Sequence, residues 1–440
     1  MASSDLPQGE TGESGRRSSR AAFQYPNFRR YMSARFLTTI ASEMQAVAVA
    51  WQVYGITHRP LDLGLVGLAQ FLPGIFLFLL AGHTADRFVR QRILETCYAG
   101  FSCCSLLLFL LTLFGLHSAY PIYAALLLNG TIRAFHSPAS QAFVPLLVPN
   151  EQLQNAIAWS SSLFQTATIL GPMLGGLLYG VSGSPRAVYL SSASAYGLAL
   201  LFMTRIRLER AERPRGAASL SYVLDGLHYI WQNKLILGAI SLDLFAVLLG
   251  GAVALLPVYA KEILKTGAMG LGILRSAPGA GAVAMSILVA RWPLRRRAGP
   301  VMLWCVLGFG AFTVVFGLSR NLALSLIMLV LIGAVDTVSV IVRHTLIQLA
   351  TPDEMRGRVS AVNMVFIGAS NEVGQFESGI TAQWLGTVPA VVVGGVGTMV
   401  IVALWAWLFP SLRRLDGLEA VETVPIVAEA TTEDASSIAE

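Results

Sequence analysis

The stretch GHTADRFVRQR, residues 82–92, places one aspartate and three arginines between two long apolar segments. LGLVGLAQFLPGIFLFLLA (63–81) precedes it and ILETCYAGFSCCSLLLFLLTLFGL (93–116) follows it. A bilayer core of ~30 Å is crossed by a helix of about 20 apolar residues, so each flank is long enough to span a membrane. The charged stretch is therefore expected to be a short turn at a membrane surface.

Apolar segments of this kind recur along the chain from about residue 34 to residue 410. Of the 440 residues, 55% are hydrophobic and only 13% are charged, whereas soluble domains carry about 25% charged residues. The segments do not alternate polar and apolar residues as barrel strands do, and helices satisfy their own backbone groups in lipid. The sequence predicts an all-α polytopic membrane protein with about twelve transmembrane helices.

The formal net charge of +6 is distributed unevenly along these segments. Most lysines and arginines fall on the side of the N-terminus, and the positive-inside rule then predicts that both termini are cytoplasmic. The basic charge thus indicates topology in a cell inner or plasma membrane, and no nucleic-acid partner is expected. Residues 1–27 and 411–440 are expected to be disordered cytoplasmic tails, and no removable signal peptide is expected.

The chain repeats itself at half its length. VPNEQLQNAIA (148–158) is echoed by TPDEMRGRVSA (351–361), and RFVRQR (87–92) by RWPLRR (291–296). The polar segment 205–234 separates the two repeats and is expected to be a cytoplasmic linker. These features predict two six-helix bundles, 28–204 and 235–410, with a small-molecule site between them near the bilayer midplane.

Taken together, these motifs resemble the major facilitator superfamily, in which a Gly, an Asp-Arg pair and a spaced basic pair connect the second and third helices. FRRYMSARF, SPASQAFVPLLVPNEQLQNAIA and ILGPMLGGLLYG are similar to the secretion-effector branch that includes bacterial enterobactin exporters. The resemblance covers residues ~28–410. It implies alternating access between two bundles and export of a small molecule against protons.

The same resemblance implies a conformational latch in the opening stretch. Asp86 would lie near the N-terminal end of the eleventh helix, around residues 357–361, where exposed N–H groups favour an anion. The neighbouring arginines would brace it and close the cytoplasmic side in the outward-facing state. The expected latch consists of Gly82, Asp86, Arg87, Arg90 and Arg92.

Ionisable residues within the predicted spans are candidates for a proton or substrate pathway, because charge is costly inside a membrane. Glu43 in the first span would take up a proton when it is desolvated, and Arg133 in the fourth span would favour its ionised form in the other conformation. Arg133 also matches an arginine position of a recurring superfamily motif. A static structural ion pair is the alternative interpretation.

Five further residues could belong to the same pathway, or could instead make lid or interface contacts. Asp243 and Asp336 are the repeat equivalents of Glu43 and Arg133. Glu372 and Glu377 differ by about 140° around one helix, so one could line the cavity while the other bonds to a neighbouring helix. The set consists of Asp243, Arg275, Asp336, Glu372 and Glu377.

The GPMLGG motif in the fifth span resembles an export-associated motif of the superfamily. Its proline disturbs the helix and its glycines permit close backbone contact. Export rather than uptake is favoured, with ordinary tight packing as the alternative. The motif residues are Gly171, Pro172, Gly175 and Gly176.

No Walker motif, nucleophile elbow or zinc motif is present, so an enzyme is not expected. Neither a cofactor nor a metal site is expected, and the proton gradient is the expected energy source. The favoured hypothesis is a monomeric proton antiporter that exports a small amphipathic molecule such as a siderophore or a drug. The alternatives are an uptake or facilitative transporter of the same fold and a membrane sensor or scaffold that does not transport.

Overall fold

The computed structural model describes residues 21–116, 118–207, 220–292 and 297–416, and these residues form helices joined by short turns. The predicted terminal tails and part of the predicted linker lie outside the described residues. The first bundle contains six long helices: α2 (Pro26–Thr57), α3 (Pro60–Arg87), α4 (Arg90–Leu113), α5 (Tyr120–Phe143), α6 (Leu153–Ser182) and α7 (Pro185–Thr204). Three short helices accompany them: η1 (Ala21–Gln24), η2 (Val144–Leu146) and η3 (Asn150–Gln152).

The second bundle also contains six long helices: α9 (Lys234–Leu249), α11 (Gly267–Arg291), α12 (Ala298–Leu318), α13 (Leu322–Ala350), α14 (Asp353–Leu385) and α15 (Thr387–Leu408). Helix α9 continues through η4 (Ala252–Leu255), α10 (Leu256–Val258) and the π-helix η5 (Tyr259–Ile263). The short helix α16 (Pro410–Arg413) follows α15. The predicted twelve-helix architecture in two bundles is confirmed.

Local sequence explains where several of these helices begin. Pro60 and Pro185 stand at the first turn of α3 and α7, where a missing N–H is tolerated. Asn233 and Asn321 cap α9 and α13, because their side-chain oxygens accept hydrogen bonds from the first free backbone N–H groups. These caps and prolines keep the connections between spans short.

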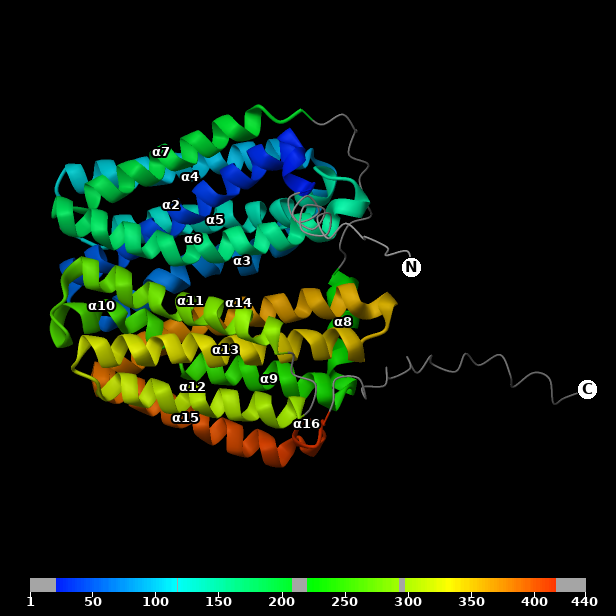
Figure 1. Cartoon of the computed structure of the whole chain (residues 1–440). Coiled ribbons are helices and arrows are strands. Elements are labelled where there is room, and N and C mark those ends of the chain that lie inside the picture. The colour runs from blue at the N-terminus through cyan, green and yellow to red at the C-terminus, as the bar shows by residue number, and fades with distance from the viewer. Residues whose placement is uncertain (1–20, 117, 208–219, 293–296, 417–440) are drawn as a thin grey trace, which may run out of the picture.

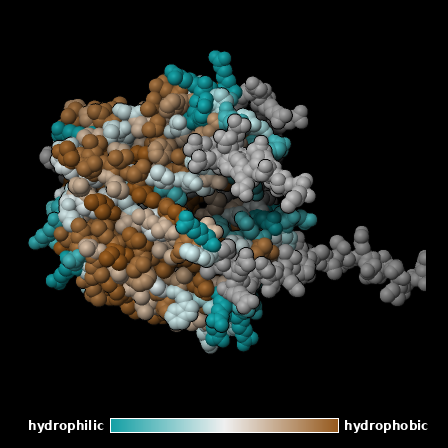
Figure 2. Space-filling model, viewed as in Figure 1, coloured by the Kyte–Doolittle hydropathy of each residue, from teal (hydrophilic) through white to brown (hydrophobic). Residues whose placement is uncertain are grey.

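In Figure 1 the two bundles lie one above the other, with the first bundle in blue to green and the second in green to red. The described chain begins and ends on one face of the molecule, and we call this the terminal face and the other the opposite face. The bundles meet along two helix pairs, α3 with α14 and α6 with α11. Both contacts lie toward the opposite face, because they involve the start of α3 and α11 and the end of α6 and α14. Figure 2 shows that the surface is hollowed between the bundles toward the terminal face.

On the face that Figure 2 shows, the surface of both bundles is largely apolar. Among the described residues, eight helices are long and apolar enough to cross a membrane by length and composition. The four remaining long helices, α2, α5, α6 and α14, are less apolar, and three of them carry Glu43, Arg133 and Glu372. Ionisable residues also lie in clearly apolar helices, because α9, α11 and α13 carry Asp243, Arg275 and Asp336.

Helix α8 (Leu220–Gln232) occupies the end of the predicted linker and packs on the second bundle. The Tyr229 hydroxyl donates a hydrogen bond to the Ala350 carbonyl at 3.0 Å, and Arg358 pairs with Asp225 at 2.9 Å. The predicted linker 205–234 therefore contains a docked helix that covers the start of α14.

Candidate functional site

The central feature of the site is an ion pair between the two bundles. Arg133 of α5 places Nη1 at 3.9 Å from Oε1 of Glu372 in α14. The Arg133 side chain is 58% exposed, although it lies in the middle of a membrane helix, whereas the Glu372 side chain is 18% exposed. An arginine this open at midhelix indicates that the space between the bundles admits water.

Glu372 lies at the edge of the contact between α3 and α14. A Cβ added to Gly67 of α3 would lie 3.2 Å from Oε2 of Glu372, so the glycine leaves room for the carboxyl group. Gln375 donates a hydrogen bond to the same oxygen at 3.3 Å. The charge of Arg275 in α11 also acts on Glu372. Three of the predicted pathway residues, Arg133, Arg275 and Glu372, therefore come together.

Glu43 does not share this site in the way that the sequence suggested. The ion-pair partner of Arg133 is Glu372 rather than Glu43, so the predicted Glu43–Arg133 pair is absent from this conformation. Glu43 packs its Cβ against Gly171 of α6, inside the first bundle. A role of Glu43 in proton transfer stays a prediction.

Glu377 faces a different environment from Glu372. Its Oε1 accepts a hydrogen bond from Thr381 at 2.6 Å, one turn further along α14. The partner of Glu377 belongs to its own helix rather than to a neighbouring one, and the expected difference in role between the two glutamates stays a prediction. Glu377 is thus held away from the ion pair.

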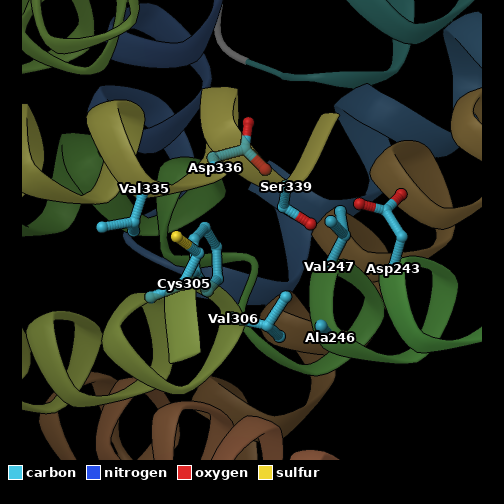
Figure 3. Close-up of a pocket in the computed structure, with 9 residues that line it drawn as sticks. Asp243, Ala246, Val247, Cys305, Val306, Val335, Asp336 and Ser339 are labelled. Atoms are coloured by element: carbon cyan, nitrogen blue, oxygen red, sulfur yellow. The ribbon is translucent and has the colours of Figure 1, made fainter. Parts of the chain in front are cut away.

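Asp243 and Asp336 lie together inside the second bundle. Asp243 of α9 forms an ion pair with Arg343 of α13, and the Arg343 side chain is only 2% exposed. Arg343 lies toward the end of α13, and its side chain turns into the bundle. Asp243 and Asp336 line one small pocket, which Figure 3 shows.

A cluster of polar and aromatic side chains on the opposite face, Trp51, Tyr54, Lys261 and Glu262, is a feature that sequence reasoning missed. The Tyr54 hydroxyl of α2 donates a hydrogen bond to Glu262 of η5. The ammonium group of Lys261 lies 6.0 Å from the ring centre of Trp51 and 5.6 Å from that of Tyr54. These contacts join the two bundles, and Lys261 and Glu262 belong to a π-helix, a distortion that is frequent at functional sites. The adjacent Lys-Glu pair at the end of an apolar span is the signal that could have indicated it.

The GPMLGG motif lies where α6 contacts two neighbours at once. A Cβ added to Gly175 would lie 2.7 Å from the Met44 Cα of α2, and one added to Gly176 would lie 2.7 Å from the Ala268 carbonyl of α11. Gly272 of α11 faces Gly176 in turn. The motif therefore contributes to the junction between the bundles, while Pro172 offers its carbonyl side to the same contact.

Replacing Gly176 by alanine is expected to weaken this junction, because the methyl group meets backbone that can move only with its helix. Overpacking typically costs about 1–3 kcal/mol, which changes a population ratio by roughly fivefold or more. Spin-label distances between the bundles at the terminal face should shorten as the opposite face opens. Gly180→Ala is the control, because its Cβ would meet only Met269 at 3.4 Å, and its distances should stay unchanged. Equal distances in both variants would contradict the prediction.

The described residues leave the predicted latch untested. The space beside Gly82 is open, since a Cβ added to Gly82 would meet no atom within 4 Å. The Asp86 side chain lies outside the described residues, whereas Arg87 and Arg92 are exposed. The expected docking segment packs instead on α8, where Gly226 contacts Arg358. The latch stays a prediction for another conformation.

A charged pair between two apolar helical bundles, exposed toward one face, is an arrangement that a membrane transporter would need. The family model described as transmembrane secretion effector matches residues 17–435, and the chain belongs to this family of the major facilitator superfamily. It is a membrane transporter and not an enzyme.

Relatives with known names agree with this family. The chain is 27% identical over 397 residues to "Enterobactin exporter EntS" of Shigella boydii serotype 4, with 89% of this chain and 93% of that protein covered. It is also 27% identical, with the same coverage, to the protein of that name from Escherichia coli O81.

Solved structures show the same fold. The nucleoside transporter NupG matches with a TM-score of 0.69 at 12% identity, covering 87% of this chain and all of that chain. A bacterial homologue of the human lysosomal transporter Spinster, in an inward-facing and occupied conformation, matches with a TM-score of 0.69 at 13% identity, covering 88% and 96%. At these identities the likeness establishes the fold alone.

Proposed function

We propose that the protein exports a small amphipathic molecule, a siderophore or a drug-like compound, by proton antiport with alternating access. The family description and the names of the relatives support export. The proposed location is a bacterial inner or plasma membrane, with both termini cytoplasmic and the monomer as the working unit. The bias of basic residues in the sequence supports this orientation.

With the termini in the cytoplasm, the structure corresponds to an inward-facing state. The hollow between the bundles then opens to the cytoplasm, and the contacts of α3 with α14 and of α6 with α11 close the outside. An exporter must load its substrate from the cytoplasm, so this is the state that would receive it. The hydrogen bond between Tyr54 and Glu262 would help to hold the outer side closed while the substrate binds.

The observation that carries the proposal is the position of Glu372 beside the closed contact. A carboxyl group is easier to bury when it is protonated, so a proton on Glu372 would favour the packed α3–α14 contact and the inward-facing state. Release of that proton to the cytoplasm would leave a carboxylate beside Gly67 that pairs with Arg133, and an anionic substrate that binds Arg133 would remove this partner and weaken the contact. The deprotonated, substrate-loaded protein would then turn outward, and protonation outside would return it, which gives exchange in opposite directions.

The charges of the site indicate which molecules would bind. Arg133 is exposed to the space between the bundles, and Arg275 lies near the same carboxylate. Two cations beside one acid leave a net positive charge, which suits an anionic or partly anionic substrate. Catecholate siderophores combine such a charge with aromatic rings.

Everted membrane vesicles test the function directly. A fluorescent catecholate and a lipophilic dye would be offered separately to vesicles energised by a proton gradient with the acidic side inside. Accumulation of one of them, and its collapse on addition of a protonophore, is the expected result. Accumulation that persists without the gradient would exclude antiport, and no accumulation in vesicles that contain the folded protein would exclude export of these two classes.

A further inference from the structure

A small pocket inside the second bundle lies apart from the central site. It is lined by α9, α12 and α13. The volume within which the centre of a water molecule fits is about 10 Å³. A volume of this size holds a single water when polar partners surround it. Its polar lining consists of Asp243, Asp336, Ser339 and the Cys305 thiol. Figure 3 shows Ser339 between the two aspartates, with its hydroxyl directed into the pocket.

The Ser339 hydroxyl is the unusual group in this pocket. Ser339 is 2% exposed, and its oxygen has no hydrogen-bond partner. A buried hydroxyl without a partner costs about 1–3 kcal/mol, and most such groups in proteins are satisfied. The neighbouring Arg343 also has a buried Nε without a partner. Arg343 does not line the pocket, so the Ser339 hydroxyl is the lining group that calls for an occupant.

The charges of the pocket do not balance. Asp243 is neutralised by Arg343, while the ion pairs of the described residues do not include Asp336. The thiol of Cys305 contributes no positive charge, and neither Arg275 of α11 nor Glu372 of α14 lines the pocket. An ionised Asp336 would thus leave one net negative charge within a membrane helix, which is costly.

We propose that Asp336 binds one proton and that a single water in this pocket joins its carboxyl group to Ser339. The proton removes the unbalanced charge, and the water satisfies the Ser339 hydroxyl. Asp336 is partly accessible, whereas Ser339 and Asp243 are buried. The site is distinct from Glu372, and within the proposed antiporter it would add a second exchangeable proton.

Infrared spectroscopy of the full-length protein in liposomes tests this site without a transport assay. Protonated and ionised carboxyl groups absorb at different frequencies, and a pH titration in sodium-free buffer resolves the buried ones. A protonated-carboxyl band present in the unmodified protein and in Glu372→Gln should be lost in Asp336→Asn. Ser339→Ala keeps every carboxyl group and should shift the frequency of that band, because the bridging water loses a partner.

The outcomes separate the alternatives. A band that survives in Asp336→Asn would overturn the proposal, as would a band that sodium removes at constant pH, because the site would then bind a metal cation. If Asp336→Asn does not assemble, an unchanged band in Ser339→Ala overturns it equally. The vesicle experiment can fail while this band behaves as expected, so the proton site and the export function are tested independently.

Discussion

Replacing Glu372 by glutamine is expected to uncouple the transporter from the proton gradient. Glutamine resembles the protonated carboxyl group permanently, so the α3–α14 contact would stay favoured at every pH and the protein would remain inward-facing. Coupling free energies between sites are typically about 1–3 kcal/mol, so gradient-driven accumulation in everted vesicles should fall by roughly 5- to 150-fold. Binding of the substrate from the cytoplasmic side should persist, because Arg133 loses only its anionic competitor.

Glu377→Gln is the matched control for this result. It makes the same chemical change on the same helix, but the carboxylate bonds to Thr381 within α14 and lies away from the ion pair. Accumulation in this variant should retain its dependence on the gradient. If the two variants behave alike, Glu372 has no special role in coupling.

The second large effect is expected for Asp243→Asn, which leaves Arg343 buried without an anion. Arginine cannot neutralise itself by losing a proton, and removing one partner of a buried pair typically costs about 3–5 kcal/mol. The free energy of unfolding, measured by an unfolding titration in mixed micelles, should fall by about 3–5 kcal/mol. The loss is expected in the fold itself rather than in substrate binding, because the pair is enclosed in one bundle.

Arg343→Met provides the comparison. It leaves Asp243 buried instead, and a carboxyl group can become neutral by taking up a proton, so the loss should be smaller and should diminish as the pH falls. The double variant Asp243→Asn, Arg343→Met should recover most of the stability lost in Asp243→Asn. A double variant as unstable as Asp243→Asn would falsify the account of an unpaired cation.

The fold was accessible from sequence because its determinants are local or periodic. Long apolar segments, short capped turns and a repeat at half length each constrain the architecture independently, and lipid leaves few alternatives for the backbone. Helix α8 was not predicted, since the polar linker carries no apolar span that would indicate it. Its position depends on contacts with α14, which are distant in sequence.

The sequence identified the residues of the site, but it did not predict which of them pair with each other. Arg133, Arg275 and Glu372 were identified because ionisable groups in membrane helices are rare. Their partners depend on how the bundles are inclined, and a sequence common to all conformations cannot specify one of them. The pairing of Arg343 with Asp243 was not predicted for a related reason. A cation near a helix end can extend to the membrane surface or turn inward, and hydropathy does not distinguish the two.

The glycine contacts between the bundles have a consequence for the speed of the cycle. Gly176 faces Gly272, and Gly64 faces Gly379, with a Cβ on Gly272 or Gly379 lying 3.0 Å from the Cα of its counterpart. At these two points the main chains of the two bundles therefore touch directly, and no side chain interlocks between the paired glycines. Helices in contact through glycines can shift against each other with a small energy barrier. The rate of turnover is therefore expected to depend on substrate binding, proton exchange and opening of the outer side rather than on this motion.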